Sequence, residues 1–212
     1  MILLLSCVYV NAQDSQLPAT IQYIETYAPL AIKEMARTGF PASIKIAQGI
    51  LETDAGRSEL VQKSNNHFGL KCKSSWTGEK VYHNDDEQGE CFRSYADANE
   101  SYLDHSDYLK SQTRYAFLFN YDPNDYDSWA NGLKKAGYAT SPIYAQTLIK
   151  NIEKYNLNAL NSIKEDSDSS NLAYYFYALE NNMIVQPTAK LGQSNNKAEE
   201  TKNITFVKQA DE

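Results

Sequence analysis

The sequence predicts a mostly helical α+β domain with a small β-rich insert near its middle. Apolar residues recur at helical spacing over residues 17–38 and again after Pro41, and helical patterns return between residues 97 and 156. Between these groups, residues 68–95 alternate apolar and polar positions around turn residues, as antiparallel strands do. The chain has 212 residues, of which 42% are apolar and 22% charged, so one domain with its own core is expected.

The charge and the aromatic content of the chain bear on its partners. The formal net charge of −7 argues against nucleic acid as the main partner, because phosphate recognition usually requires an excess of basic residues. The 16 tyrosines suit packing in the core, which composition alone favours, and they also suit stacking on the apolar face of a sugar ring. His67, His83 and His105 lack metal-ligand spacing, so we expect structural or surface roles for them and no metal site.

The first residues predict export. Residues 2–10 are nearly all apolar but too few to span a membrane, and they resemble the central region of a secretory signal. We expect a signal peptide over residues 1–12, cleaved after Ala12, and no stable membrane insertion afterwards. The basic segment that usually precedes such a region is missing. Lipid attachment at Cys7 is the alternative, and the large side chain of Leu5 disfavours it.

Two helices are expected in the first third of the chain. The first covers residues 17–38, where Pro29 should kink or split it and Gly39 should end it. The second starts at Ala42 or Ser43, and its apolar run leads directly to a carboxylate, Glu52.

A turn and a short helix follow. Gly56 should reverse the chain, and a third helix should begin after Ser58, whose hydroxyl suits a helix cap.

The β-rich insert contains the two cysteines that remain once the signal is removed. Turn residues at 77–78 and 85–89 divide it into a hairpin or a three-stranded lobe. An even number of cysteines in an exported protein suggests a disulfide, here between Cys72 and Cys91, and a metal site is less favoured. Such a bond would hold together a lobe that has little core of its own.

Three helices are expected after the insert, at about 97–110, 127–136 and 142–156. Gly137 should close the second, and the third should open with Ser141 as its cap and Pro142 at its first position. We therefore predict one domain over residues 13–158. Residues 159–212 read as a linker and a largely disordered tail that contains one short apolar piece, residues 172–185.

Several ordered blocks of the sequence resemble one enzyme family. Ala47, Glu52-Thr53 and Gly56 match its helix-end motif, and the run Asn65 to Lys71 (NNHFGLK) matches the motif that follows. The block Gly137-Tyr138-Ala139-Thr140 matches a third, although Ser141 stands where the family usually has Asp. Over about residues 20–158 the chain resembles the bacterial peptidoglycan N-acetylglucosaminidases of glycoside hydrolase family 73.

The resemblance implies a fold and an activity. The fold is lysozyme-like, with a helical lobe and a small β-hairpin lobe on either side of a glycan groove. The reaction is endo-hydrolysis of the β-1,4 bond after N-acetylglucosamine in peptidoglycan glycan strands, which would be the partner of this chain. No metal or other cofactor is implied, and the expected location is periplasmic or extracellular, at the cell wall.

Glu52 is the expected general acid. Glycoside cleavage needs a carboxyl that keeps its proton near neutral pH. An apolar helix end disfavours the charged form and should raise the pKa of Glu52. The resemblance places a second carboxylate on the hairpin, where we prefer Asp86, then Asp85, then Glu87, as general base or as stabiliser of positive charge. Assistance from the N-acetyl group of the substrate stays open.

The remaining expected site residues come from the family motifs and from aromatic positions. Tyr138 should line the groove near the acid, and Asn66, Phe68, Tyr115 and Thr140 are expected to contact the substrate. Packing in the core is the competing role for Phe68 and Tyr115.

We expect Trp129 to lie in the core. A lytic transglycosylase on the same fold and an inactive glycan-binding protein are the alternative functions.

Overall fold

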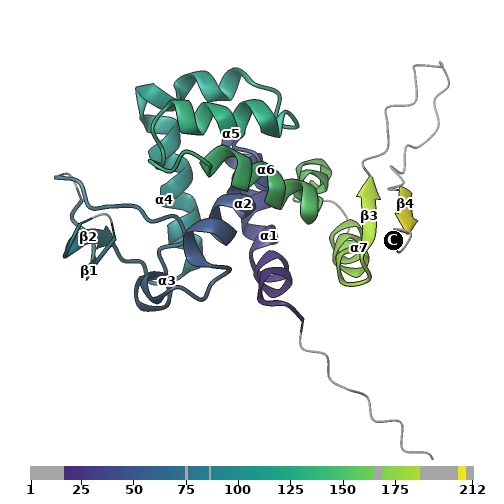
Figure 1. Cartoon of the computed structure of the whole chain (residues 1–212), viewed down its shortest axis with the longest axis horizontal. Helices are drawn as coiled ribbons and strands as arrows, with labels where there is room; N and C mark the ends of the chain where they lie inside the picture. The colour runs from purple at the N-terminus through teal and green to yellow at the C-terminus, as the bar shows by residue number, and fades with distance from the viewer. Residues whose placement is uncertain (1–16, 75, 86, 165–168, 187–204, 209–212) are drawn as a thin grey trace, which may run out of the picture.

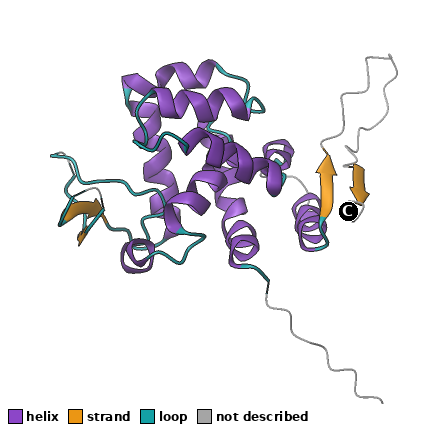
Figure 2. Cartoon of the chain, viewed as in Figure 1, coloured by secondary structure: helices purple, strands orange, loops and turns teal. Residues whose placement is uncertain are grey.

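The computed structural model describes residues 17–74, 76–85, 87–164, 169–186 and 205–208, and it confirms the mostly helical α+β class (Figures 1 and 2). A helical lobe and a separate β-hairpin lobe lie side by side in Figure 1. The described elements are α1 (Ala19–Thr38), α2 (Ala42–Thr53), α3 (Glu59–Ser64), β1 (Lys80–His83), β2 (Glu90–Arg93), α4 (Ala98–Ser111), η1 (Thr113–Asn120), α5 (Tyr126–Lys135), α6 (Tyr144–Lys154), η2 (Leu157–Ser162), α7 (Ser169–Glu180), β3 (Met183–Gln186) and β4 (Thr205–Lys208), where η marks a 3-10 helix.

Helix α2 lies at the centre of the helical lobe. It packs against α1, α5, α6 and η2, and ten of its residues are buried. Gly49 permits the close approach of α1, because a Cβ at this position would collide with the hydroxyl of Tyr23. The central, apolar α2 therefore forms the rigid base on which its C-terminal residues are held.

The first helix is continuous. Pro29 lies inside α1 without splitting it, because the residues on either side, including Ala28 and Ala31, are buried against the core and hold the helix together. Gly39 ends α1 in the left-handed conformation, with φ of 82°, as expected.

The start of α6 differs from the prediction. Ser141 and Pro142 form a turn in which the amide of Tyr144 donates to the carbonyl of Ser141 at 3.3 Å. The helix begins only at Tyr144, and the amide of Thr147 bonds to the carbonyl of Ile143 at 2.9 Å. Ser141 is therefore not the helix cap, and the turn brings residues 138–143 to the surface between the lobes.

The packed core continues beyond residue 158, where we expected the domain to end. Leu160 and Ile163 are buried in the main core, next to η2. Helix α7 packs against α1, and the hydroxyl of its buried Tyr175 donates to the carbonyl of Tyr155 at 2.9 Å. The apolar piece expected near residues 172–185 is thus part of the fold.

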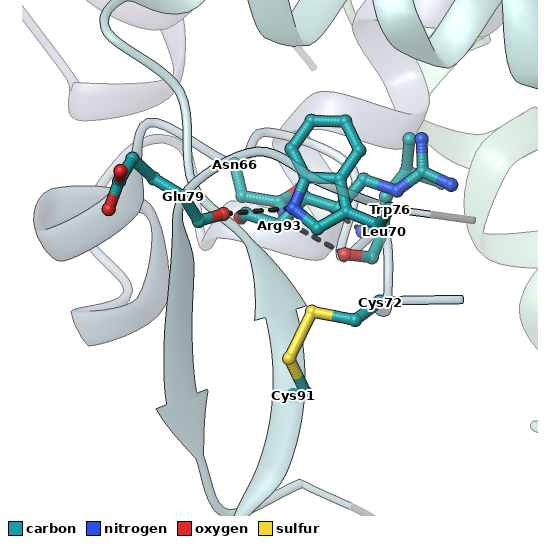
Figure 3. Close-up of a disulfide and its surroundings, with 7 residues drawn as sticks. All are labelled: Asn66, Leu70, Cys72, Trp76, Glu79, Cys91 and Arg93. Carbon is teal, nitrogen blue, oxygen red and sulfur yellow. Dashed lines mark hydrogen bonds between the residues drawn. A yellow bond between two sulfur atoms is a disulfide. The ribbon is translucent and has the colours of Figure 1, made fainter. Parts of the chain in front are cut away.

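The β-lobe is a two-stranded antiparallel hairpin with one extra bridge. Val81 pairs with Phe92 in β2, and Lys71 bridges Phe92 from the other side. Cys72 and Cys91 form the expected disulfide, beside a backbone bond from the amide of Cys72 to the carbonyl of Cys91 at 2.8 Å (Figure 3). The covalent bond ties the hairpin to the chain that arrives from the helical lobe.

A second small sheet pairs β3 with β4 in antiparallel register. Among the described residues, no helix is both long and apolar enough to cross a membrane. The expected signal peptide and Cys7 lie outside the described residues.

Candidate active site

A cleft of about 610 Å³ lies between the helical lobe and the hairpin. Its lining comes from the end of α2, from residues 68–71, from the hairpin, from η1 and from residues 138–147. Both lobes therefore contribute side chains to one cleft, which is the arrangement that the family resemblance implied.

Glu52 occupies the last turn of α2 and lines this cleft. The next residues, Asp54, Ala55 and Gly56, have φ of 49°, 53° and 82°, so the chain leaves the helix through three consecutive left-handed residues. The Thr53 side chain supports this reversal, since its Oγ1 accepts from the amide of Gly56 at 2.8 Å. The reversal takes the backbone away and leaves the Glu52 carboxyl facing the cleft.

The surroundings of Glu52 favour its protonated form. Burial against the apolar end of α2, and secondly the negative charge of Asp85, raise the pKa of Glu52 to about 7. Oε2 of Glu52 lies 3.7 Å from the position that a Cβ would occupy on Gly69. A carboxyl with this pKa can donate a proton at neutral pH.

The hairpin acids differ in position. Asp85 lines the cleft opposite Glu52, and its Oδ2 lies 3.9 Å from Nζ of Lys71. Glu87 is exposed and is not among the described residues that line the cleft. Asp86, the acid that we preferred from the sequence, lies outside the described residues. Among the described hairpin acids, Asp85 is the one in position to act on a ligand in the cleft.

Tyr138 and Tyr144 form an aromatic wall. Their rings stack with centroids 5.8 Å apart and an interplanar angle of 26°, and both line the cleft. The hydroxyl of Tyr138 lies 3.1 Å from Nε2 of His105 and 3.2 Å from the carbonyl oxygen of Phe68. Tyr144 is 3% exposed, so it packs behind Tyr138, and the half-buried Tyr138 ring is the one of the pair that can present a face to a sugar ring.

Four other residues were expected to contact the substrate, and three of them, Thr140, Phe68 and Tyr115, line the cleft. Thr140 is exposed and lines the cleft. Phe68 and Tyr115 reach the cleft as part of its lining, but they are 2% and 1% exposed, so most of each ring packs in the core. Trp129 is fully buried, as expected.

Asn66 does not line the cleft, contrary to our expectation. Its side chain is 1% exposed, and Nδ2 donates to the carbonyls of Leu70 and Arg93 at 3.0 and 2.9 Å. Its Oδ1 accepts from the amide of Leu70 at 3.0 Å. The amide group joins the 65–71 loop to β2, so Asn66 supports the loop that lines the cleft; Figure 3 shows Asn66 beside Leu70 and Arg93.

Some lining residues were not singled out from the sequence. Tyr144 carries no motif of its own, and its hydroxyl accepts from Nε2 of the buried Gln48 at 2.8 Å. Arg114 lies over the ring of Tyr115 at 4.7 Å. His83, for which we expected a structural or surface role, enters the lining from β1. These residues are distant in sequence, and only the folded chain brings them to the cleft.

Within the described part of the chain, no group of three or more histidine, cysteine, aspartate or glutamate side chains is arranged to hold a metal ion.

The chain is similar to known proteins in sequence and in fold. A family model described as Glucosaminidase, Mannosyl-glycoprotein endo-beta-N-acetylglucosaminidase, matches residues 28–157. The peptidoglycan hydrolase FlgJ of Vibrio cholerae is 33% identical over 159 residues, which is 68% of this chain and 47% of that protein. The exo-glucosaminidase LytG of Bacillus subtilis is 35% identical over 142 residues, or 61% of this chain and 49% of that protein. The chain thus spans about half the length of these relatives.

Solved structures agree with these matches. A peptidoglycan hydrolase from Sphingomonas sp. A1 superimposes with a TM-score of 0.59 and 29% identity, covering 73% of this chain and 94% of that one. The glycoside hydrolase domain of FlgJ from Salmonella typhimurium gives a TM-score of 0.55 and 27% identity, covering 73% and 98%.

Proposed function

Because this chain belongs to the glucosaminidase family, we propose that it is an endo-β-N-acetylglucosaminidase that cleaves β-1,4 bonds in the glycan strands of peptidoglycan. The polymer is suggested by the relatives, several of which carry the name peptidoglycan hydrolase. A cleft that is open between two lobes is suited to a long polysaccharide.

Glu52 acts as the general acid in this proposal. The observation that carries it is a carboxyl with a pKa of about 7 in the lining of the cleft. Protonation of the glycosidic oxygen makes the sugar a good leaving group, and a group with a pKa near the working pH does this best. The ring of Tyr138, which packs on the buried Tyr144, would hold a sugar ring beside it.

Asp85 is the second carboxylate in this proposal. Its negative charge faces the cleft from the hairpin and would stabilise the positive charge that develops on the sugar ring, or activate a water molecule. In either role it also keeps Glu52 protonated between turnovers, because a nearby negative charge disfavours ionisation. Participation of the substrate N-acetyl group would leave Asp85 only the first role and would retain the anomeric configuration.

Substitution of the proposed acid tests the activity. We expect Glu52→Gln to lower the release of soluble fragments from purified sacculi by roughly 10²–10⁴-fold, the usual contribution of general acid catalysis. Asp54→Asn is the matched control, because Asp54 lies two residues away and is exposed in an ion pair with Arg57. Unchanged lysis by Glu52→Gln would contradict the proposal.

The products test the bond that is cleaved. Mass spectrometry should find N-acetylglucosamine at the new reducing ends. An anhydro-muramoyl end would instead identify a lytic transglycosylase, and a purified protein that binds glycan without cleaving it would be an inactive binding protein. NMR of the fresh product would assign retention or inversion of the anomeric centre.

The substrate also implies a location. We propose that the protein acts outside the cytoplasm, in the periplasm or at the cell surface, where peptidoglycan lies. N-terminal sequencing of the protein recovered from cells should begin at Gln13, and a chain that retains residues 1–12 would contradict cleavage there.

A further inference from the structure

A lysine lies inside the central helix, behind the cleft, and the proposed reaction does not use it. Lys45 of α2 is 0% exposed. Its Nζ lies 3.1 Å from the carbonyl of Tyr102, 2.6 Å from Oγ of Ser106 and 3.1 Å from Nδ1 of His105. A buried lysine is costly unless its hydrogen bonds are satisfied, and here all three of its donors have an acceptor.

The lysine determines which nitrogen of His105 carries a hydrogen. A protonated amine has donors only, so Nδ1 of His105 must accept from Lys45. Burial, and secondly the charge of Lys45, hold the pKa of His105 well below its usual range, so its ring is neutral. A neutral ring whose Nδ1 accepts carries its single hydrogen on Nε2.

The hydrogen on Nε2 of His105 lies toward Tyr138, which lines the cleft. Nε2 of His105 donates to the hydroxyl oxygen of Tyr138 at 3.1 Å, and the Tyr138 hydroxyl donates to the carbonyl of Phe68 at 3.2 Å. A tyrosine hydroxyl has one hydrogen, so Tyr138 can bond to both partners only while His105 is the donor. With the hydrogen on Nδ1, Tyr138 would have to donate to His105, and the Phe68 carbonyl would lose this bond.

The bond between Tyr138 and Phe68 joins two sides of the cleft. Phe68 precedes Gly69, which lies beside the Glu52 carboxyl, and the Phe68 ring stacks on His105 with centroids 3.9 Å apart. Tyr138 stacks in turn on Tyr144 in the aromatic wall. The Tyr138–Phe68 bond therefore links the aromatic wall to the segment beside Glu52.

We propose that Lys45 is a positioning residue for the cleft: by donating to Nδ1 of His105 it holds the tautomer in which Tyr138 bridges His105 and the Phe68 carbonyl. The effect on turnover rests on the proposed glycosidase function, whereas the tautomer itself does not.

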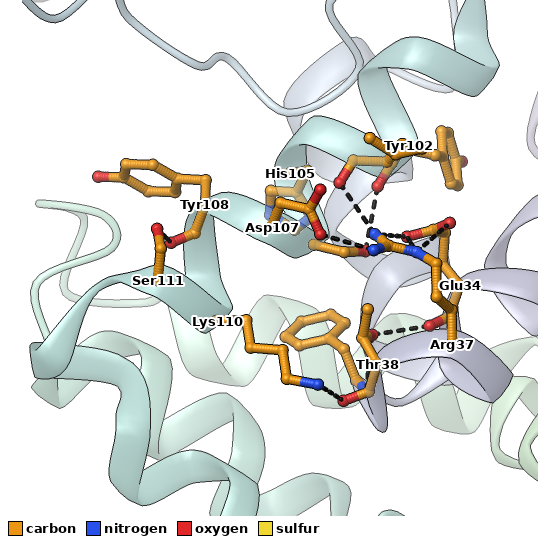
Figure 4. Close-up of polar contacts among 12 residues, drawn as sticks. Glu34, Arg37, Thr38, Tyr102, His105, Asp107, Tyr108, Lys110 and Ser111 are labelled. Atoms are coloured by element: carbon orange, nitrogen blue, oxygen red, sulfur yellow. Dashed lines mark hydrogen bonds and ion pairs between the residues drawn. The ribbon is translucent and has the colours of Figure 1, made fainter. Parts of the chain in front are cut away.

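The charges around Lys45 decide whether it stays protonated. Burial lowers the pKa of Lys45 to about 7, and the carboxylate of Glu34 on α1 opposes this effect. The Arg37 guanidinium of α1 lies 2.7 Å from both Glu34 and Asp107 of α4, and it acts on Lys45 in the opposite sense to these acids (Figure 4). Below neutral pH Lys45 is therefore protonated, and Nδ1 of His105 can only accept from it. As the pH rises through about 7 the neutral amine gains a lone pair, and Lys45 no longer dictates which nitrogen of His105 carries the hydrogen.

Nitrogen NMR on protein labelled at histidine tests the tautomer without any substrate. At pH 6 we expect the His105 signals of a neutral ring protonated at Nε2, assigned by their loss in His105→Gln. In Lys45→Met we expect a shift toward the Nδ1-protonated form or a mixture. A ring protonated at Nδ1 in the unsubstituted protein, or identical spectra in Lys45→Met, would overturn the proposal, whether or not the protein cleaves peptidoglycan.

Kinetics on soluble glycan fragments test the route through Tyr138. We expect Lys45→Met to lower kcat about tenfold, with little change in KM, in the otherwise unsubstituted chain, and less than about twofold in a chain that carries Tyr138→Phe. Phenylalanine keeps the ring but removes the hydroxyl through which Lys45 acts. An equal loss in both chains would mean that Lys45 acts through general packing and would overturn the proposal.

A second pair of variants covers the case in which Lys45→Met does not fold. The amide of His105→Gln can supply the donor toward Tyr138, whereas His105→Asn keeps an acceptor toward Lys45 and loses that donor. We expect His105→Gln to retain roughly ten times the kcat of His105→Asn when both are folded by circular dichroism. Equal kcat values would contradict a role for the donor.

Discussion

Glu52 and Asp85 face one cleft from opposite lobes, and the negative charge of Asp85 contributes to the raised pKa of Glu52. The two residues are 33 positions apart, one at the end of a buried helix and the other at the tip of a hairpin. We propose different roles for them because their surroundings differ: Glu52 is partly desolvated, while the Asp85 side chain is 56% exposed. Five measurable consequences concern this pair of carboxylates, the disulfide of the hairpin, the 65–71 loop and the end of the domain.

The first concerns the pH dependence of cleavage. The proposed acid works only when protonated, so we expect kcat/KM on sacculi fragments to fall as the pH rises through about 7. Asp85→Asn removes the charge that disfavours ionisation of Glu52, so it should move this alkaline limb to lower pH. An alkaline limb at the same pH in Asp85→Asn would contradict electrostatic coupling between the two residues.

The second concerns stability. The pKa of Glu52 rises from an ordinary value of 4.5 to about 7 on folding, so its contribution to stability is greatest below pH 4.5 and is lost as the pH rises through 7. Glu52→Gln, which cannot ionise, should therefore be about 1–3 kcal/mol more stable than the parent protein at pH 8, with little of this gain at pH 4. Urea unfolding at the two pH values measures the difference, and an equal gain at both would contradict it.

The third concerns the disulfide. Cys72 and Cys91 are 19 positions apart, and a cross-link of that length contributes about 3 kcal/mol by restricting the unfolded chain. We expect Cys72→Ser combined with Cys91→Ser to unfold the hairpin lobe at lower temperature and to lower activity, because Asp85 is carried by this lobe. Hydrogen exchange should locate the loss of protection in β1 and β2. Exchange that increases mainly in the helical lobe would contradict this assignment.

The fourth concerns Asn66. Its buried amide joins the 65–71 loop to β2 through bonds to three backbone groups of Leu70 and Arg93, so Asn66→Ala should cost about 2–4 kcal/mol. Asn131→Ala is the matched control, because the Asn131 side chain makes one exposed bond to its own helix. Thermal melts of the two variants should differ by several degrees. A small effect of Asn66→Ala would show that the loop is held in another way.

The fifth concerns the end of the domain. A chain that stops at Asn158 loses the buried Leu160 and Tyr175, whereas a chain that stops at Gln186 keeps both. Each large buried side chain contributes about 2–5 kcal/mol, so we expect the shorter chain to be much less stable or not to fold. Equal melting temperatures would contradict a structural role for η2 and α7.

The sequence by itself determined the local structure well. Glycine at position 39, the Ser58 cap and the apolar period of α2 act over a few neighbouring residues, and each has the structure that its local chemistry predicts. The Cys72–Cys91 pair was also predictable, because only two cysteines remain after the expected signal. The predictions that Ser141 caps α6 and that Pro142 is its first residue were wrong. These two residues form a local turn that lies before the helix.

Only the tertiary structure decided which side chains meet at the cleft. Asn66 and Thr140 both belong to family-like motifs, yet one supports the loop and the other is exposed in the lining. Likewise, nothing adjacent to Lys45 in the sequence predicts that its ammonium group contacts Nδ1 of His105, or that Nε2 of the same ring contacts the hydroxyl of Tyr138. Periodicity reports only how a residue sits on its own helix or strand. Hydrogen-bond partners and desolvation depend on residues from other elements, and these are set only when the chain is packed.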